Sequence, residues 1–224
     1  MRTATSVDTG VEPRPMAGVT PLVYIVDDDV SVREAIACLV ENAGWRAETF
    51  ASAQDFLGRP RAQRPCCLIL DLGLPDLNGL EVQERLSGAH AEMPIIFVTG
   101  RGDVPTTVRA MKAGAAEFLT KPFEPDTLTQ AIESAVERSR ALLEQRTALQ
   151  ALNDHHQALS RREKEVMALV VRGRLNKQIA AELGISEITV KAHRGRMMRK
   201  MKVRSVPELV GVASRLGHDT VKTS

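Results

Sequence analysis

The chain has 224 residues, of which 43% are hydrophobic and 26% charged, and its formal net charge at pH 7 is +2. This composition is typical of a globular protein with one large or two small domains. No apolar run approaches the roughly 20 residues of a membrane-spanning helix, so we expect no membrane span. Residues 160–224 hold 15 of the 30 Lys and Arg residues but only six of the 28 Asp and Glu residues. An acidic first part and a basic last part indicate two domains, and the basic one is expected to bind a polyanion.

The first twenty residues lack the apolar stretch of a signal peptide, and their Pro, Gly and Thr content predicts a disordered leader. The three cysteines have neither a metal-binding spacing nor an even number for disulfide pairing. Cys38 falls within a helical pattern, whereas Cys66 and Cys67 lead into an apolar run. We therefore expect buried thiols in a protein of the reducing cytoplasm.

Short apolar runs alternate with helical patterns from residue 22 onward. Strands are predicted at 22–26, 46–50, 66–72, 94–100 and 116–123, and helices at 31–44, 52–58, 78–88, 103–115 and from 126 to about 155. Strands that alternate with helices predict an α/β domain, a doubly wound (βα)5 parallel sheet covered on both faces. Such sheets bind ligands at the carboxyl ends of their strands.

Polar side chains lie at four of these strand ends. Asp27 and Asp28 follow the first strand. Near the ends of the third, fourth and fifth runs, Asp71 follows "LIL", Thr99 follows "IIFV" and Lys121 follows "EFLT". Neighbouring carboxylates repel each other unless a cation compensates, so the set suits phosphoryl transfer to a carboxylate. Asp71 is the candidate nucleophile, Asp27 and Asp28 would hold Mg²⁺, and Lys121 and Thr99 would contact phosphate oxygens. Two alternatives are an acidic turn that caps the next helix and a Mg²⁺-dependent phosphohydrolase.

The helical pattern that starts at 126 continues without a break to about residue 155. Its apolar residues keep a spacing of three or four, but Ser139 and Arg146 interrupt the seam. The segment is either a solvated extension of the last helix or a short coiled coil.

Four short helical patterns make up the second domain. They are predicted at 159–173, 176–186, 187–201 and 205–217. Ser160 and Glu163 have the spacing of a capping box, Asn176 and Ser186 are predicted N-caps, and Pro207 falls in the first turn of the last helix. A tight turn between the second and third helices predicts an all-α helix-turn-helix domain.

The third of these helices has two distinct faces. At 100° per residue, Val190, Met197 and Met201 cluster on one side, which is the predicted core face. The opposite arc carries cations and mostly small residues: Ile188, Lys191, Ala192, Gly195, Arg196 and Arg199. This arc suits a helix that enters the major groove of duplex DNA. A generic basic solvated helix and RNA binding are the alternatives, although no aromatic stacking platform supports RNA.

The motifs resemble a known family. The first part is similar to the receiver domain of two-component response regulators, in the motifs "VYIVDDD", "LILDLGLPDLNGLEV", "IIFVTGRGDV" and "AAEFLTKPF". The last part resembles the DNA-binding domain of the LuxR/NarL/FixJ group, in the motifs "LSRREKEV", "NKQIAAELGIS" and "TVKAHRGRMMRKM". The receiver is most like that of the FixJ branch. The resemblance divides the chain into a leader (1–20), a receiver domain (21–139), a helical linker (140–157), a helix-turn-helix domain (158–217) and a tail (218–224).

For the receiver, the resemblance implies that a sensor histidine kinase phosphorylates Asp71 and that the backbone carbonyl of Gly73 joins the Mg²⁺ ligands. Phe118 would be the aromatic switch residue, and the Lys121–Pro122 bond would be cis. Asp29 falls at a variable position and would at most support the cation ligands. Phosphorylation would change the surface of the fourth helix, fifth strand and fifth helix and promote a homodimer.

For the second domain, the resemblance implies base contacts from Lys191, Ala192 and the position of Gly195, where a longer side chain is commoner. Arg196 and Arg199 would hold phosphates, and Thr189 lies where contacts to the DNA backbone are favoured. The expected partners are therefore the kinase, a double-stranded DNA operator and RNA polymerase, for a phosphorylation-activated transcriptional regulator in the cytoplasm.

Overall fold

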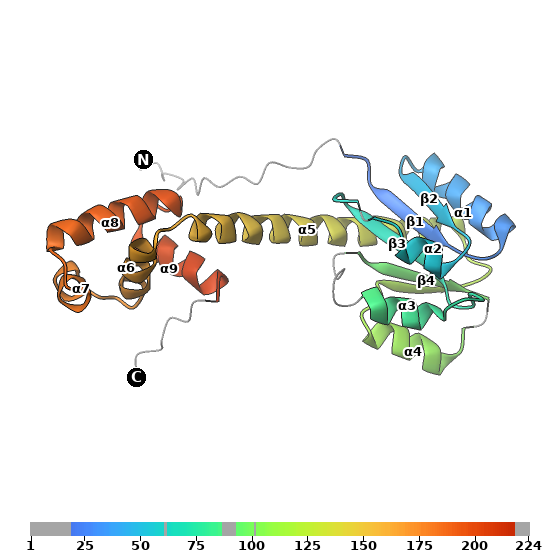
Figure 1. Ribbon diagram of the computed structural model, residues 1–224. Helices are drawn as coiled ribbons and strands as arrows, with labels where there is room; N and C mark the ends of the chain where they lie inside the picture. The colour runs from blue at the N-terminus through green and yellow to red at the C-terminus, as the bar shows by residue number, and fades with distance from the viewer. Residues whose placement is uncertain (1–18, 61, 87–92, 101, 218–224) are drawn as a thin grey trace, which may run out of the picture. The chain divides into compact units, whose positions relative to one another are not determined.

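The computed structural model describes residues 19–60, 62–86, 93–100 and 102–217 (Figure 1). Most of the predicted leader and all of the predicted tail lie outside these residues. The chain divides into two compact units between Glu144 and Gln145. The first unit contains a sheet with its helices, and the second contains helices alone among its described residues.

The first unit is built on a parallel sheet. Its strands are β1 (Leu22–Val26), β2 (Arg46–Phe50), β3 (Cys66–Asp71), β4 (Ile95–Thr99) and β5 (Glu117–Thr120). Its helices are α1 (Val30–Asn42), α2 (Ala53–Leu57), α3 (Gly79–Leu86) and α4 (Val104–Lys112), and α5 (Pro125–Gln157) begins in it. Neighbouring strands pair in parallel in the order β2-β1-β3-β4-β5. The predicted (βα)5 sheet is confirmed, with strand ends within three residues of those expected.

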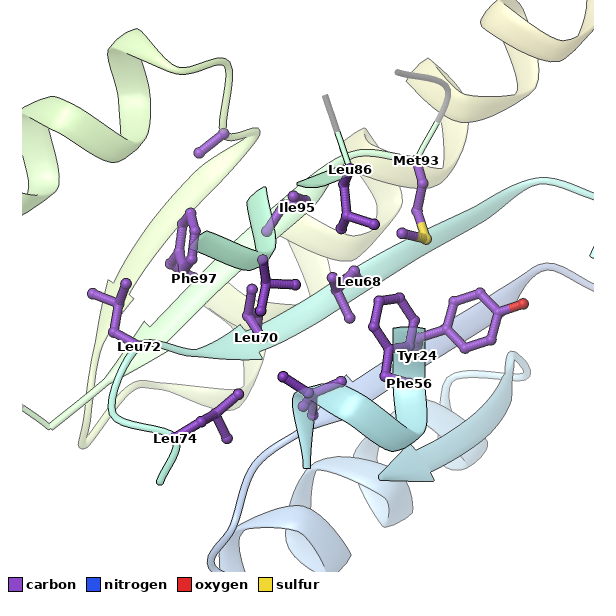
Figure 2. Close-up of a cluster of buried hydrophobic side chains, with 14 of the residues drawn as sticks. Tyr24, Phe56, Leu68, Leu70, Leu72, Leu74, Leu86, Met93, Ile95 and Phe97 are labelled. Atoms are coloured by element: carbon purple, nitrogen blue, oxygen red, sulfur yellow. The ribbon is translucent and has the colours of Figure 1, made fainter. Parts of the chain in front are cut away.

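Both faces of the sheet are buried, which explains why its strands are continuously apolar. Side chains alternate across β1, so Tyr24 and Val26 pack on one face while Val23 and Ile25 pack on the other. Figure 2 shows the first face, where Tyr24 lies beside Phe56 of α2. Buried residues of α2, α3 and α4 belong to this cluster, and those of α1 and α5 belong to the opposite one.

The second unit contains four short helices after the end of α5. They are α6 (Arg161–Val171), α7 (Asn176–Leu183), α8 (Glu187–Lys200) and α9 (Val206–Arg215). Val166, Ile179, Val190 and Leu209, one from each helix, meet in a single apolar core. Gly184 takes a left-handed backbone conformation, φ +64°, and ends α7 just before α8 begins. The predicted helix-turn-helix arrangement is confirmed.

One of the predicted helix caps is wrong. Ser160 and Glu163 form the expected capping box, and Ser186 accepts a hydrogen bond from the Thr189 N–H. Asn176, however, is the first residue of α7 and not its N-cap. Its carboxamide oxygen accepts a hydrogen bond from Arg194 of α8 at 2.9 Å, and therefore serves packing between helices.

The prediction of buried thiols is wrong for one cysteine. Cys66 and Cys67 are buried in β3, and burial raises the pKa of the Cys67 thiol. Cys38 is exposed, because Ile36 and Val40 occupy the inward-facing positions of α1. Two positions along a helix correspond to about 200°, so Cys38 points away from the face that Ile36 and Val40 share.

The helix α5 runs without a break through 33 residues, across the junction of the two units. Ser139, which interrupts the apolar seam, is buried, and its hydroxyl accepts a hydrogen bond from the Cys66 N–H at 3.1 Å. Whether this helix pairs with that of a second chain stays a prediction. Among the residues that the structure describes, no helix is both long and apolar enough to cross a membrane.

Candidate functional site

Three carboxylates gather at the carboxyl edge of the sheet. Val26 of β1 is the register partner of Leu70 on β3, so the residues that follow, Asp27 and Asp71, emerge side by side. One ligand oxygen from each of Asp27, Asp28 and Asp71 lies within 4.8 Å of the others. Asp27 is buried, Asp71 is partly exposed and Asp28 is exposed, so the group leads from the sheet to solvent.

Lys121, at the end of β5, reaches this group. Its Nζ donates to Asp27 Oδ2 at 2.6 Å and lies 3.4 Å from Asp71 Oδ2. Burial raises the pKa of Asp27 although Lys121 opposes this effect. Burial also acts to lower the pKa of Lys121, but the hydrogen bond and the charge of Asp27 outweigh it and raise that pKa. The Lys121–Pro122 bond is cis, as predicted.

The donor set fits Mg²⁺. Three carboxylates against one ammonium leave two negative charges without a counterion in the group, and carboxylate oxygens are the ligands that Mg²⁺ prefers. Gly73 lies beside the same group, because its N–H donates to Asp71 Oδ1 at 3.2 Å. The predicted acidic residues are therefore brought together in one acidic pocket, of the kind that is typical of a Mg²⁺ site.

Thr99 lies on β4, which is next to β3, and Phe118 lies on β5, which pairs with β4. Thr99 ends β4, is buried, and is the register partner of Thr120 on β5. Phe118 is partly buried, with its ring centroid 6.2 Å from that of Phe97. Gly102 packs so closely that a Cβ there would lie 3.2 Å from Phe118 Cε1 and 2.8 Å from Thr120 Cγ2. This contact, which the sequence analysis missed, ties the segment after β4 to the predicted switch residue.

The aspartates of the acidic turn after β1 have different structural roles. Asp29 caps α1 by accepting hydrogen bonds from the Ser31 and Val32 N–H groups, so the helix-capping alternative holds for this residue. Its own N–H donates to Asp27 Oδ1 at 3.0 Å. Arg33, which sequence reasoning missed, donates to the Asp27 carbonyl oxygen at 2.6 Å. Backbone groups and Arg33 thus hold Asp27 in place.

In the second unit, α8 has the two faces that its sequence predicts. Val190, Met197 and Met201 are buried in the core. The residues of the outer arc are exposed: Ile188, Lys191, Ala192, Gly195, Arg196 and Arg199. Thr189 is half-buried, and its hydroxyl lies 2.8 Å from that of Ser186.

A buried carboxylate links α8 to α6. The Glu163 side chain is 3% exposed, and Lys200 Nζ donates to its Oε2 at 2.7 Å. Arg196 Nε lies 3.5 Å from Oε1 of the same carboxylate. The hydrogen bond from Lys200 is the main reason that the pKa of Glu163 falls to about 2. Sequence reasoning assigned Glu163 to the capping box alone and missed its pairing with α8, and it assigned Arg196 to phosphate without this partner.

Comparisons with known proteins find a family match in each of the two units. Residues 23–133 match the response regulator receiver domain, and residues 157–213 match the bacterial regulatory proteins of the luxR family. The chain is 44% identical over 203 residues to the response regulator protein TodT of Pseudomonas putida, covering 91% of this chain and 89% of TodT. The chain belongs to the response regulators. Its receiver is joined to a LuxR-type helix-turn-helix domain, as predicted.

Two further proteins support the assignment to this group of response regulators. The chain is 38% identical over 195 residues to the transcriptional regulatory protein FixJ of Bradyrhizobium diazoefficiens, covering 87% of this chain and 95% of FixJ. The solved structure of the response regulator StyR is 45% identical, with a TM-score of 0.80, and the match covers 88% of this chain and all of StyR. This response regulator is thus a member of a family of transcription regulators and not an enzyme, which sets aside the phosphohydrolase alternative.

Two residues that hold the segment after Asp71 in place in this response regulator were missed. The Asp76 carboxylate accepts hydrogen bonds from the Ala53 and Gln54 N–H groups, at 3.3 and 2.9 Å, and ties the loop after β3 to α2. A Cβ at Gly79 would lie 2.8 Å from the Asp71 carbonyl oxygen, so α3 packs directly against the end of β3. Neither contact has a local signal in the sequence, because both join segments that only the fold brings together.

Proposed function

We propose that a sensor histidine kinase phosphorylates Asp71 and that the phosphate promotes binding of duplex DNA. The Asp71 carboxylate attacks the phosphorus of the kinase phosphohistidine, the phosphorus–nitrogen bond breaks, and the imidazole nitrogen keeps the electron pair. The observation that carries the proposal is the convergence of three carboxylates and the Lys121 ammonium at one edge of the sheet. Asp71 is the candidate acceptor because it ends the central strand and is partly exposed.

The residues around Asp71 have complementary roles in this proposal. Asp27, Asp28, Asp71 and the backbone carbonyl of Gly73 would hold Mg²⁺, which, when bound, neutralises charge on the transferring phosphoryl group. Lys121 would pair with another phosphate oxygen. Its Nζ lies 3.4 Å from Asp71 Oδ2, within reach of a group attached there.

The signal would travel along β4 and β5. Thr99 would donate a hydrogen bond to the phosphate, and Phe118 would turn further inward behind it, as a two-state switch. The partly buried ring of Phe118 and its contact with the segment at Gly102 support this proposal. A movement of the Phe118 ring would displace the segment at Gly102, and the reverse, because the two pack so closely that even a Cβ at Gly102 would be too near the ring.

The surface that changes would form a homodimer. Val104, Val108 and Met111 lie on one side of α4 and are 76%, 43% and 41% exposed. Three apolar side chains at a spacing of four and three residues form a helical stripe, which a second copy of the receiver would cover. We therefore place the dimer contact on the surface of α4, β5 and α5.

Each protomer would then present α8 to one half of a two-fold symmetric operator. Lys191, Ala192 and Gly195 would contact bases, while Thr189, Arg196 and Arg199 would contact the DNA backbone. Arg196 would have to share its charge with Glu163, so Arg199 is the stronger candidate for phosphate. We place the regulator in the cytoplasm, acting on transcription together with RNA polymerase.

Selection from a random duplex DNA pool tests the proposal. The full-length protein would be used with and without Mg²⁺–beryllofluoride, which mimics the aspartyl phosphate, and the same selection would be run with Asp71→Ala. We expect a two-fold symmetric motif that is enriched with the mimic and is lost in the variant. Equal enrichment in both conditions would refute phosphorylation as the control, and no motif in either would refute sequence-specific DNA binding.

A further inference from the structure

We infer that Ile188 contacts the C5-methyl group of a thymine and thereby contributes to the choice of DNA site, an inference that rests on the proposed DNA-binding function. Ile188 is the second residue of α8 and is 79% exposed, more than any other large hydrophobic side chain in the described residues. The rest of α8 is not loosely packed, since Val190 and Met197 are fully buried. The exposure of Ile188 is therefore a property of its place on the helix.

That place is on the predicted DNA-facing stripe. At 100° per residue, Ile188 lies about 60° around the helix from Lys191 and about 20° from Gly195. It also lies in the first turn, and residues at the N-terminal end of a recognition helix are those that contact base edges. Ile188 would thus reach the floor of the major groove before any cation on the later turns does.

The chemistry of the Ile188 side chain indicates which group of the major groove it contacts. Isoleucine has no side-chain donor or acceptor, and the C5-methyl of thymine is the apolar feature on the major-groove edges of the bases. The backbone at Gly195 can approach the groove closely, because no heavy atom of the described residues outside its own helix and chain neighbours lies within 4 Å of where a Cβ would be. Lys191 and Arg199, exposed on the same arc, complement the charge of a duplex.

The test removes single methyl groups from the DNA. Starting from the enriched duplex, each thymine in the half-site would be replaced in turn by deoxyuridine, which keeps base pairing but lacks the C5-methyl. Fluorescence anisotropy with the full-length protein and the aspartyl-phosphate mimic would give the dissociation constants at one fixed salt concentration. For one thymine per half-site, we expect binding to weaken about fourfold per methyl removed, as for the loss of one buried methyl group.

The matching variant is Ile188→Ala, which should bind the thymine and deoxyuridine duplexes equally well at that position. Leu175→Ala is the control, because Leu175 is a 70% exposed apolar residue of the same unit that lies outside α8 and should leave the ratio unchanged. Specific binding without a deoxyuridine effect at any thymine, or an effect that persists in Ile188→Ala, would overturn the inference alone. Failure to enrich any duplex would refute the proposed function and the inference with it.

Discussion

Replacing Glu163 by glutamine should loosen the contact between α6 and α8 while leaving the capping box in place. The amide oxygen of Gln can still accept the Ser160 N–H, which donates to Glu163 Oε2 at 2.8 Å. The negative charge that pairs with Lys200 and Arg196 is lost, however. The variant therefore isolates the charge of a carboxylate that is almost completely buried.

The size of the effect follows from the pKa of Glu163, which falls from 4.5 to about 2. Unscreened, that shift corresponds to roughly 3 kcal/mol. Because the Lys200 side chain is 40% exposed and solvent screens the pair, we expect a loss of about 1–2 kcal/mol. A lowered folded-state pKa stabilises the protein above pH 4.5, and this stabilisation disappears as the pH falls from 4.5 toward 2. The difference between wild type and variant should shrink over the same range.

Hydrogen exchange followed by mass spectrometry can locate the loss in the full-length protein. At pH 7, protection of peptides from α6 and α8 should fall by a factor of roughly 5–30, while peptides from β3 serve as an internal reference. The ratio of variant to wild-type rates cancels the intrinsic pH dependence of exchange. Glu165→Gln is the control, because the Arg162 and Arg161 side chains that pair with Glu165 are half to fully exposed and should matter little. A ratio near one at pH 7, or a ratio that stays constant down to pH 3, would refute the reasoning.

Three further substitutions test separate contacts. Gly79→Ala should destabilise the receiver by about 1–3 kcal/mol in urea unfolding followed by Trp45 fluorescence, because its Cβ would lie 2.8 Å from the Asp71 carbonyl oxygen. Gly195→Ala should instead stabilise the second unit by up to about 1 kcal/mol in thermal unfolding, since a Cβ there meets open space within a helix. Val108→Asp should abolish dimerisation with beryllofluoride in analytical ultracentrifugation and leave the monomer folded; an unchanged dimer would exclude the α4 stripe.

Features that depend on neighbours along the chain could be predicted from the sequence. The apolar runs predict the strands of the parallel sheet, and Ser160 and Glu163 form their capping box within one turn. Asp27 and Asp71 could also be placed together, because the carboxyl ends of parallel strands meet at one edge of a sheet. The faces of α8 followed from helical periodicity, as the burial of Val190 and Met197 shows.

The tertiary structure decided which distant groups become partners. Lys200 pairs with Glu163, 37 residues away in the chain, and the Gln54 N–H donates to Asp76, 22 residues away. No local sequence pattern predicts either pairing. The same holds for Asn176, whose position suits a cap but whose carboxamide bonds to Arg194 on the next helix. Local sequence determines the dihedral angles and the apolar face of each element, but the packing of those faces determines which polar side chains come within hydrogen-bonding distance.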